Sequence, residues 1–481
     1  MVLAVAGMGA TAQAAGANVL TVDDDKVQCP SADYTSVVTA VAAASQGDDI
    51  RICDGTYTVP GGAGSSGLKI EKNVDLLGAG ADKVFIQPDG TSPTMAALVP
   101  NERDEFGNVI TVKRRTVELA DIEISGLTVR GNGTAAEAGI AMIDVNESSI
   151  HDVRVSGIAP DTGPGTGLFA VAPLSGSGHG IVVANTIEQT VNETAIDRVA
   201  VSGFNKAGIV VDSRTLNGTA ERTNTMKATI SDSSVTGAGT SAVVAQDGIE
   251  GWGKSATVLL NRNLITGVAA PGAQSGTALV VGGSAGIYFR GVNPASTIGG
   301  SRLTANSISA NTFGAYAANF AGTTFAAPYV NAATNYWGSS NGPSTPPTKS
   351  AGDFAGAGAP TFGGGLTTAP FLGTAPTPPV TPGAVQDSAP RAEFDTLKDG
   401  AKTTVGAPVA LDVVATDDFG VKGVEYFVDG VSIGSSATFP YEFDWIPSTA
   451  DDAAVHRVTV VVTDSAGGTT ELAANVQVGT L

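Results

Sequence analysis

The feature that most constrains this fold is a short segment that recurs along the first two thirds of the chain. Its first copy reads Leu119-Ala-Asp-Ile-Glu-Ile124-Ser-Gly. Further copies begin at Ile150, Ile196, Ile230, Leu260 and Leu303, at intervals of about 30–46 residues. Recurrence at such a period indicates one supersecondary unit stacked many times rather than a single globular core.

Aligning the copies predicts two interior columns, because side chains of a strand point inward at every second residue and rungs lie about 4.8 Å apart. The first column is Leu119, Ile150, Ile196, Ile230, Leu260 and Leu303, and the second is Ile124, Val155, Val201, Val235, Ile265 and Ile308. Between them stand Ile122, Val153, Val199, Ser233, Asn263 and Asn306. The change from Val to Ser and Asn predicts a turn whose amides hydrogen-bond along the stack.

A second wall is predicted at a recurring Gly-Ile pair, found at Gly139, Gly180, Gly208, Gly248 and Gly286. Counting on from each glycine gives two outward columns. They are Ala141, Val182, Val210, Glu250 and Tyr288, and Ile143, Ala184, Asp212, Trp252 and Arg290. Loops of variable length join the walls, and such loops on a rigid scaffold commonly carry function.

The first seventeen residues are small and apolar, and Ala12-Gln-Ala14 fits a signal-peptide cleavage site, although no basic residue precedes them. We expect residues 1–17 to be a signal peptide. The alternative is that this segment forms a buried N-terminal strand. Cys29 and Cys53 are the only cysteines, and a close pair in an exported chain predicts one disulfide. Residues 34–44 have the apolar spacing of a short helix, suited to cap the first coil.

The composition of the chain limits the classes of molecule that it can bind. Only 15% of the 481 residues are charged, and the formal net charge is −20. A chain of this balance lacks the basic face that nucleic acids require. Past the leader, no apolar stretch is long enough to span a bilayer. We therefore expect a secreted or cell-surface monomer that binds neither nucleic acid nor membrane.

Several motifs resemble those of secreted right-handed parallel β-helix proteins of the pectin-lyase-like superfamily. They are Cys29-Pro-Ser-Ala-Asp-Tyr34, the run from Gly47 to Tyr57, Val74-Asp-Leu-Leu-Gly78, and the closing Asn335-Tyr-Trp-Gly338 with Asn341-Gly-Pro343. The resemblance covers roughly residues 18 to 345. It implies an all-β fold: a right-handed parallel β-helix over 18–342 with an N-terminal helical cap.

Ten of the 24 prolines fall in residues 343–390, which predicts a semi-rigid linker; an irregular cap over the last coil is the alternative. Residues 391–481 contain short alternating strands and turn signals, typical of a small antiparallel β-sandwich. The string Val424-Glu-Tyr-Phe-Val-Asp-Gly430, with Pro440-Tyr441 and Trp445 after it, resembles bacterial Ig-like domains of secreted glycan-active proteins.

The second wall carries the candidate substrate-binding residues. If its rungs are consecutive, acidic, basic and aromatic side chains gather on one outer face: Asp212, Asp247, Glu250, Trp252, Tyr288 and Arg290. Aromatic faces stack on sugar rings, and arginine pairs with a uronate carboxylate. The residues therefore predict a polysaccharide or cell-wall glycan as partner, an ordinary solvated face with an Arg–Asp pair being the alternative.

Candidate catalytic residues are His179, Lys206 and Arg290, each of which could serve as the base of a uronate lyase. Gly178-His179-Gly180 matches an element of polygalacturonases, but the spaced carboxylate pair of an inverting hydrolase is missing. Asp212, Asp247 and Glu250 have the ligand type that Ca²⁺ prefers. No cofactor is otherwise implied, and Lys206 has a solvated turn as its alternative interpretation.

In the sandwich, Asp417, Asp418 and Asp464 follow two strands whose loops share one end of an Ig-like topology. They predict either a Ca²⁺ site or ordinary turns, since aspartate is a common turn former.

Because no complete catalytic set is visible, the sequence favours binding over processing of an extracellular polysaccharide. An enzyme of this pattern would be a lyase or glycoside hydrolase acting on a uronate-containing glycan. The rival interpretation is a non-catalytic adhesin or structural spacer that attaches through its Ig-like domain.

Overall fold

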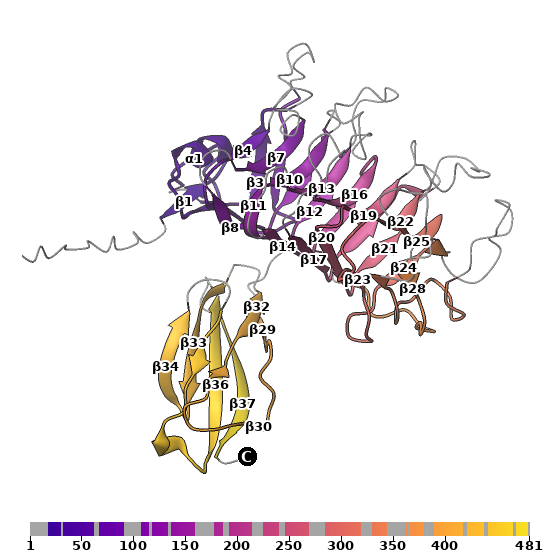
Figure 1. Ribbon diagram of the computed structural model, residues 1–481. Helices are drawn as coiled ribbons and strands as arrows, with labels where there is room; N and C mark the ends of the chain where they lie inside the picture. Colours follow the sequence, from indigo (N-terminus) through magenta and orange to yellow (C-terminus); the bar gives the residue numbers. More distant parts are fainter. Residues whose placement is uncertain are drawn as a thin grey trace, which may run out of the picture.

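A computed structural model describes residues 18–479 of the chain and shows a long stack of parallel strands followed by a smaller antiparallel unit (Figure 1). Within that range it leaves out residues 30–31, 62–66, 91–106, 115–117, 133–135, 159–177, 186–191, 214–224, 240–245, 269–283, 319–329, 344–360, 363–365, 380–381, 383–388, 417–420, 437–440 and 465–467. The predicted leader, residues 1–17, lies outside the described residues.

Three parallel sheets form the stack. Sheet A runs in the order β1 (Val19–Val22), β2 (Asp48–Ile52), β5 (Val74–Gly78), β8 (Leu119–Ser125), β11 (Val145–His151), β14 (Asn192–Asp197), β17 (Met226–Ser231), β20 (Ala256–Asn261), β23 (Thr297–Ile298), β26 (Val330–Asn331) and β28 (Leu366–Thr367). Sheet B contains β3 (Gly55–Val59), β6 (Val84–Pro88), β9 (Thr128–Arg130), β12 (Arg154–Ser156), β15 (Ala200–Ser202), β18 (Ser234–Thr236), β21 (Leu264–Thr266) and β24 (Ser307–Ser309). Sheet C contains β4 (Leu68–Ile70), β7 (Asn108–Lys113), β10 (Ala138–Ile143), β13 (His179–Ala184), β16 (Ala207–Asp212), β19 (Asp247–Trp252), β22 (Ala285–Arg290), β25 (Phe313–Ala318) and β27 (Thr361–Phe362).

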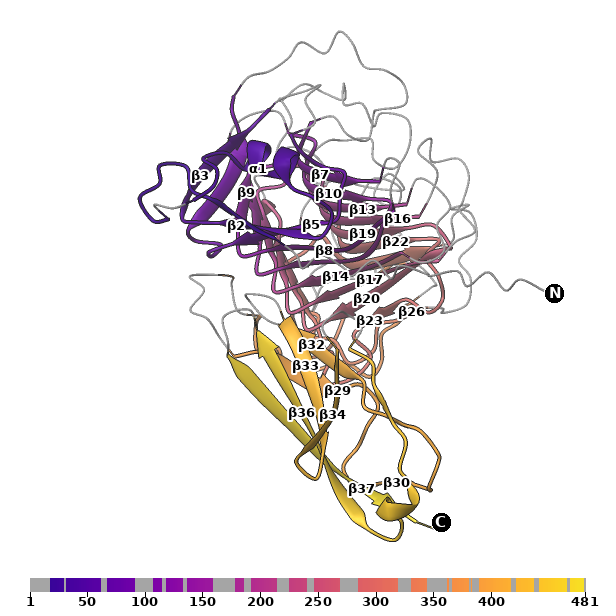
Figure 2. The ribbon, with the colours of Figure 1, turned by 90° about the vertical axis from the view of Figure 1, so that its left-hand side faces the viewer.

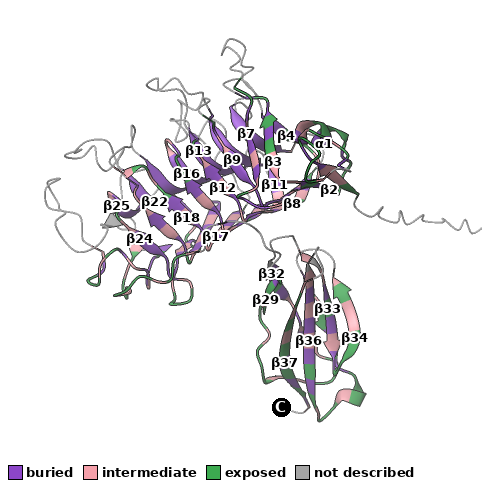
Figure 3. Ribbon diagram, turned by 180° about the vertical axis from the view of Figure 1, so that it is seen from behind, coloured by how far each residue is buried: buried purple, intermediate pink, exposed green. Residues whose placement is uncertain are grey.

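The chain visits the sheets in the order A, B, C and then returns to A one rung further on. Figure 2 looks from the N-terminal end and shows the three sheets enclosing a common interior. That interior is one continuous apolar core, which Figure 3 shows as buried strand positions along the whole stack. The fold is therefore a parallel β-helix, as the repeat predicts.

The two interior columns lie in sheets A and B, with one correction at the first copy. Ile150 pairs with Ile124 rather than with Leu119, whose partner is Val145. In sheet B, the partner of Val155 on the preceding rung is likewise Val129 rather than Ile124. β8 and β11 are long enough to present inward apolar residues at both spacings, so the pattern alone does not separate the two registers.

Leu303 corrects the other end of the ladder. Its side chain is 84% exposed, and Ile298 occupies the interior position beside Leu260. Extra residues between β23 and β24 place Leu303 in a surface turn. Its spacing from Ile308 matches the repeat in sequence, although Leu303 does not lie on a strand of the coil.

The predicted amide ladder stands at the corner between sheets A and B. Asn263 Oδ1 accepts from Ser233 N at 3.0 Å, and Asn306 Oδ1 accepts from Asn263 N at 2.8 Å. Asn335 Oδ1 continues the series by accepting from Asn306 N at 2.8 Å. These side chains are buried, so each one satisfies backbone donors that the turn would otherwise leave unpaired.

The recurring glycines of sheet C break the alternation of its strands. A Cβ on Gly208 would lie 2.4 Å from Cγ1 of Val235, inside the coil, and one on Gly180 would lie 2.3 Å from Cγ1 of Val201. The glycine backbone thus packs against the interior, and the isoleucine after it also faces inward. The residue before each glycine consequently returns to the outer face, among the apolar residues that cover sheet C.

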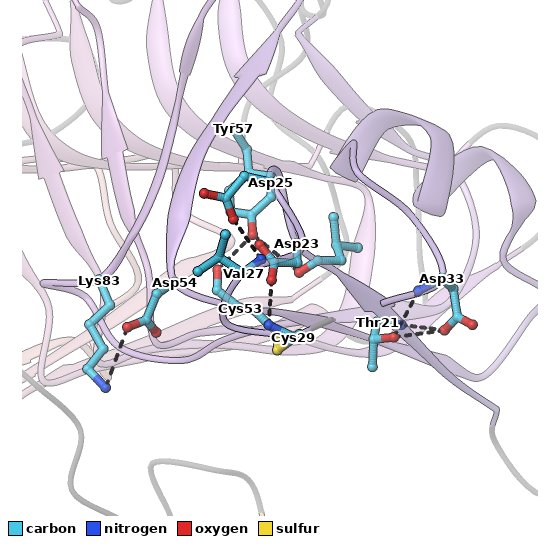
Figure 4. Close-up of a disulfide and its surroundings, with 11 residues drawn as sticks. Thr21, Asp23, Asp25, Val27, Cys29, Asp33, Cys53, Asp54, Tyr57 and Lys83 are labelled. Carbon is cyan, nitrogen blue, oxygen red and sulfur yellow. Dashed lines mark hydrogen bonds and ion pairs between the residues drawn. A yellow bond between two sulfur atoms is a disulfide. The ribbon is translucent and has the colours of Figure 1, made fainter. Parts of the chain in front are cut away.

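The N-terminal end is closed as predicted by a short helix, α1 (Val37–Ala43), packed beside β1 and β4 (Figure 1). The disulfide Cys29–Cys53 ties the segment before this helix to the end of β2. Figure 4 shows its surroundings, where Asp23 Oδ2 accepts from Cys29 N at 2.5 Å and the Tyr57 hydroxyl donates to Cys53 O at 2.7 Å. The cap and the first coil are therefore joined covalently and by hydrogen bonds.

At the other end, sheets A and C continue further than the proposed boundary at residue 342. β27 pairs with β25 and β28 with β26, so parts of 361–372 belong to the stack. Leu372 N donates to Asn335 O at 2.9 Å, which agrees with the alternative of an irregular cap over the last coil. Whether the remaining residues act as a linker stays a prediction.

The C-terminal unit has a five-stranded sheet of β30 (Ala401–Thr403), β37 (Thr469–Val478), β36 (Val455–Asp464), β33 (Val421–Val428) and β34 (Val431–Ser436). Two strand pairs accompany it: β29 (Arg391–Phe394) with β32 (Val413–Thr416), and β31 (Val409–Ala410) with β35 (Asp444–Trp445). A short 3₁₀ turn, η2 (Thr449–Asp451), precedes β36. Its core is separate from that of the β-helix and is centred on Leu411, Tyr426 and Val460. Across the described residues, no helix has the length and apolar character that a membrane crossing needs.

Candidate functional site

The outer face of sheet C carries the predicted site residues in the predicted register. Glu250 pairs with Val210 on one side and Tyr288 on the other, while Trp252 lies between Asp212 and Arg290. Because the bulge at the glycine turns the preceding residue outward, His179 and Asp247 share this face. Their direction could not be read from simple alternation.

These side chains are buried, which differs from the open surface that the sequence suggested. Glu250 is 1% exposed and His179 1%, and Asp212, Asp247, Trp252 and Tyr288 are all below 9%. Arg290 is half-buried at the end of β22. Around them lies a second apolar cluster, formed by Ala138, Ala141, Ile143, Val182, Ala207, Val210, Ala285, Phe313 and Tyr316 together with the two aromatic site residues. The candidate site is thus an enclosed polar group within an apolar layer.

The centre of the site is an ammonium between two carboxylates. Lys206 Nζ lies 2.6 Å from Asp247 Oδ2 and 3.7 Å from Glu250 Oε1. Asp247 Oδ1 accepts from Ala285 N at 3.1 Å, and the Trp252 indole donates to Glu250 Oε2 at 3.0 Å. We refer to Lys206, Asp247, Glu250 and Trp252 as the polar cluster.

Burial and neighbouring charge set the protonation of this cluster. Burial raises the pKa of Glu250 to about 8, although the positive charge of Lys206 opposes the change. Burial by itself would lower the pKa of Lys206, but the charges of Asp247 and Glu250 outweigh that effect and hold the pKa above its ordinary value. Lys206 therefore stays cationic at neutral pH, which does not suit the role of a base.

The aromatic residues form a ladder along the stack. The rings of Tyr288 and Tyr316 stack at 4.9 Å with an interplanar angle of 10°, and Trp252 lies 5.4 Å from Tyr288 on the other side. Burial raises the pKa of the Tyr288 hydroxyl to about 12. Both faces of the Tyr288 ring are therefore occupied by other rings and are closed to stacking on a sugar.

Arg290 occupies the edge of this ladder. Its guanidinium carbon lies 5.5 Å from the centre of the Trp252 ring. Within the described part of the chain, no carboxylate is recorded as an ion-pair partner of Arg290, in contrast to Lys206. Within those residues the guanidinium of Arg290 is therefore not paired with a carboxylate, whereas the ammonium of Lys206 is.

Among the described residues, Asp212, Asp247 and Glu250 do not form a group of three carboxylates close enough to share a metal ion. The ammonium of Lys206 lies beside both Asp247 and Glu250, where a metal ion would compete with it. Among the described residues, three carboxylates come close enough to share a cation only at Asp23, Asp24 and Asp25, near the disulfide. In the Ig-like unit, Asp417 and Asp418 lie outside the described residues; Asp464 ends β36, and its side chain is not described.

A second charged network, which the sequence did not reveal, lies on the outer face of sheet A. His151 is held between Glu123 Oε1 at 3.0 Å and Asp152 Oδ2 at 2.8 Å. Arg198 Nε, after β14, donates to Asp152 Oδ1, after β11, at 2.9 Å. On the next two rungs, Arg262 Nε, after β20, donates to Asp232 Oδ1, after β17, at 2.8 Å.

Four members of this network share an unusual backbone. Asp152, Arg198, Asp232 and Arg262 alternate in charge and all have φ between 46° and 55°. The signal for the network was a charged residue that follows the last strand residue in four successive coils of sheet A. Charges at that position resemble ordinary turn residues in sequence.

Comparison with known proteins finds a family match in the C-terminal unit. Residues 390–460 match a family described as bacterial Ig domain, so the C-terminal unit is an Ig domain of that type. A solved structure of the fibronectin(III)-like modules of Clostridium thermocellum CbhA is 25% identical over 21% of this chain and 53% of its own, with a TM-score of 0.18. The alignment thus spans about half the length of that protein.

Two solved structures align with most of the chain at low identity. Escherichia coli ybhc is 10% identical, covering 76% of this chain and 89% of its own, with a TM-score of 0.30. The A-module of the mannuronan C-5 epimerase AlgE4 of Azotobacter vinelandii is 15% identical, covering 74% and 98%, with a TM-score of 0.23. No curated protein matches the chain. Likenesses at these scores do not bear on what this protein does.

Proposed function

We propose that this protein is extracellular and acts on a uronate-containing polysaccharide at the outer face of sheet C, with the polar cluster as its chemical centre. One observation supports the proposal above all: Lys206, Asp247 and Glu250 gather on neighbouring rungs of a largely apolar, buried face. Burying an ion pair costs several kcal/mol that hydrophobic residues of the same size would not. Perturbed ionisable groups in such a setting are typical of functional sites.

Arg290 accounts for the choice of an acidic sugar. It is half-buried at the edge of the cluster and free of a recorded carboxylate partner among the described residues. A planar guanidinium forms two parallel hydrogen bonds with a carboxylate, so Arg290 fits the carboxylate of a uronate. Lys206 cannot take that role equally well, since Asp247 already neutralises it.

An extracellular location is part of the proposal. The disulfide Cys29–Cys53 persists most readily in an oxidising compartment. A bacterial Ig domain at residues 390–460 is compatible with the same location. Together with the predicted leader, these features support export of the chain.

Binding is tested by titrating the purified protein with polyuronates and with neutral glucans in a calorimeter, with and without Ca²⁺. The proposal expects polyuronate binding that weakens at least tenfold in Arg290→Ala, because a charge-assisted hydrogen bond contributes about 1.5–3 kcal/mol. Arg262→Ala is the matched control, since Arg262 pairs with Asp232 on another sheet. Equal binding of neutral and acidic glycans, or equal loss in both variants, would contradict a uronate site on sheet C.

A second candidate is a non-catalytic surface spacer, and one observation favours it. The rings of Tyr288 and Tyr316 stack on each other, which stabilises successive coils and leaves those faces unavailable to a sugar. In that case every glycan of the panel should fail to bind, and Arg290→Ala should alter the stability of the protein alone.

A further inference from the structure

The two carboxylates beside Lys206 are not equivalent. Its ammonium lies 2.6 Å from Asp247 but 3.7 Å from Glu250. Asp247 also accepts a backbone hydrogen bond from Ala285, whereas Glu250 accepts the neutral indole N–H of Trp252 and shares a side-chain hydrogen bond with Asp247. The single ammonium therefore lies closer to Asp247, and the buried Glu250 shares it at the longer distance.

From this geometry we propose that Glu250 holds a proton at neutral pH and is the proton donor of the site, while Lys206, paired with Asp247, is a fixed cation. The donor role rests on the proposed function, because it needs a glycan as the acceptor. The protonation state does not, since it follows from the arrangement of the side chains alone.

The charged and titratable groups around Glu250 agree with this assignment. From β16 and the residue before it come Asp212 and Lys206, from β19 Asp247, and from β22 Tyr288 and Arg290, with His179 further along the same face on β13. Burial raises the pKa of Glu250 to about 8; Lys206 lowers it and Asp247 raises it. The two nearest charges thus act in opposite directions.

The step assigned to Glu250 moves one proton. Its carboxyl O–H bond breaks as a new O–H bond forms on a glycan oxygen, and the electron pair stays on the carboxylate. The resulting negative charge lies 3.7 Å from the Lys206 ammonium, which stabilises it. Trp252 is a positioning residue, since its indole N–H fixes one oxygen and directs the other towards the cation.

Tryptophan fluorescence tests the protonation state without any glycan. Ionisation of Glu250 should change the emission of Trp252, whose indole donates to it, with a midpoint near pH 8. Trp337 and Trp445 also emit, and Trp445 lies 5.5 Å from the titratable His456. The signal of Trp252→Phe is therefore subtracted as the background.

Substitution of the two nearest charges should shift this midpoint in opposite directions. Lys206→Met should raise it by roughly one pH unit or more, and Asp247→Asn should lower it by a similar amount, since it frees Lys206 to pair with Glu250. Glu250→Gln should abolish the transition. Lys227→Met, which removes an exposed ion pair with Glu193, should leave it unchanged. Circular dichroism restricts each titration to the pH range in which the variant is folded.

The outcomes separate the two levels of the proposal. A transition below pH 6, one that persists in Glu250→Gln, or shifts of the same sign in both charge variants would overturn the assigned protonation state. The predicted titration, together with loss of glycan turnover in Glu250→Gln, supports the whole proposal. The predicted titration in a protein that turns over no glycan supports the protonation state and overturns the donor role.

Discussion

The ammonium of Lys206 lies 2.6 Å from a carboxylate oxygen of Asp247, and these residues stand on neighbouring rungs of sheet C. Lys206 is only 19% exposed and Asp247 5% as side chains, so water screens the pair weakly. Each charge makes the burial of the other tolerable. Removal of one partner alone should therefore destabilise the folded protein more than removal of both.

Asp247→Asn should destabilise the protein by about 3–5 kcal/mol, because it leaves a buried ammonium with a weaker partner. The double variant Lys206→Met/Asp247→Asn should recover most of that loss. Chemical denaturation followed by circular dichroism measures both values. A double variant as unstable as the sum of the two single ones would show that the pair does not interact.

Glu250→Gln should change how stability depends on pH. The pKa of Glu250 is raised in the folded state from 4.5 to about 8, so its contribution is fully present below pH 4.5 and is lost as pH rises through 8. The wild-type protein should therefore lose stability between pH 5 and pH 9 on the order of a few kcal/mol relative to Glu250→Gln, which does not ionise. Melting temperatures of the two proteins over that range check the difference, and parallel curves would contradict it.

His151→Gln should destabilise the protein mainly at neutral and acidic pH. Burial alone would lower the pKa of His151, but Glu123 and Asp152 raise it to about 10. A raised pKa gives stability that is present below pH 6.5 and is lost as pH rises through 10. The loss in the variant should be roughly 3 kcal/mol at pH 6 and much smaller at pH 10.5. A loss independent of pH would assign His151 a packing role only.

Reduction of the disulfide should loosen the N-terminal cap. Cys29 and Cys53 are 24 residues apart, and closing a loop of that length stabilises a fold by about 3 kcal/mol. The double variant Cys29→Ser/Cys53→Ser should melt at a lower temperature and show faster amide exchange at α1 and β1. Unchanged amide exchange at α1 and β1 would show that the disulfide does not stabilise the cap.

Asn306→Ala should be costly because its side chain makes two hydrogen bonds to the preceding coil. Its Oδ1 accepts from Asn263 N at 2.8 Å, and its Nδ2 donates to Leu260 O at 2.9 Å. Loss of these buried bonds should cost about 2–4 kcal/mol. Asn261→Ala, at a half-buried position on the outside of β20, is the control and should cost under 1 kcal/mol.

Much of the fold follows from the sequence, because the β-helix repeats its spacing. The interior positions Val155, Val201 and Val235 align in the copies and pair in sheet B. The predicted alignment of the copies was wrong at two positions. At Leu119 two spacings fit the pattern equally well, and at Leu303 a surface turn has the same spacing as the repeat. Apolar spacing alone distinguishes neither Leu119 from Ile124, two inward residues of one strand, nor an inward residue from an exposed one such as Leu303.

The site followed from the sequence only in part. The outer columns that contain Glu250 and Arg290 are correct, because strands alternate regularly after the glycine. Burial of these residues and the ion pair of Lys206 were not predicted, since they depend on segments distant in the sequence. The network around His151 was missed because its charges look like turn residues.

The central claim is that the polar cluster acts on a uronate-containing glycan. Its most direct test is incubation of the mature protein with polyuronates near pH 7, following new reducing ends and the absorbance of unsaturated uronates. The account predicts product from the wild-type protein, little from Glu250→Gln, and wild-type amounts from the control Arg262→Ala. Absence of both products and of any bound glycan, or undiminished product from Glu250→Gln, would contradict it.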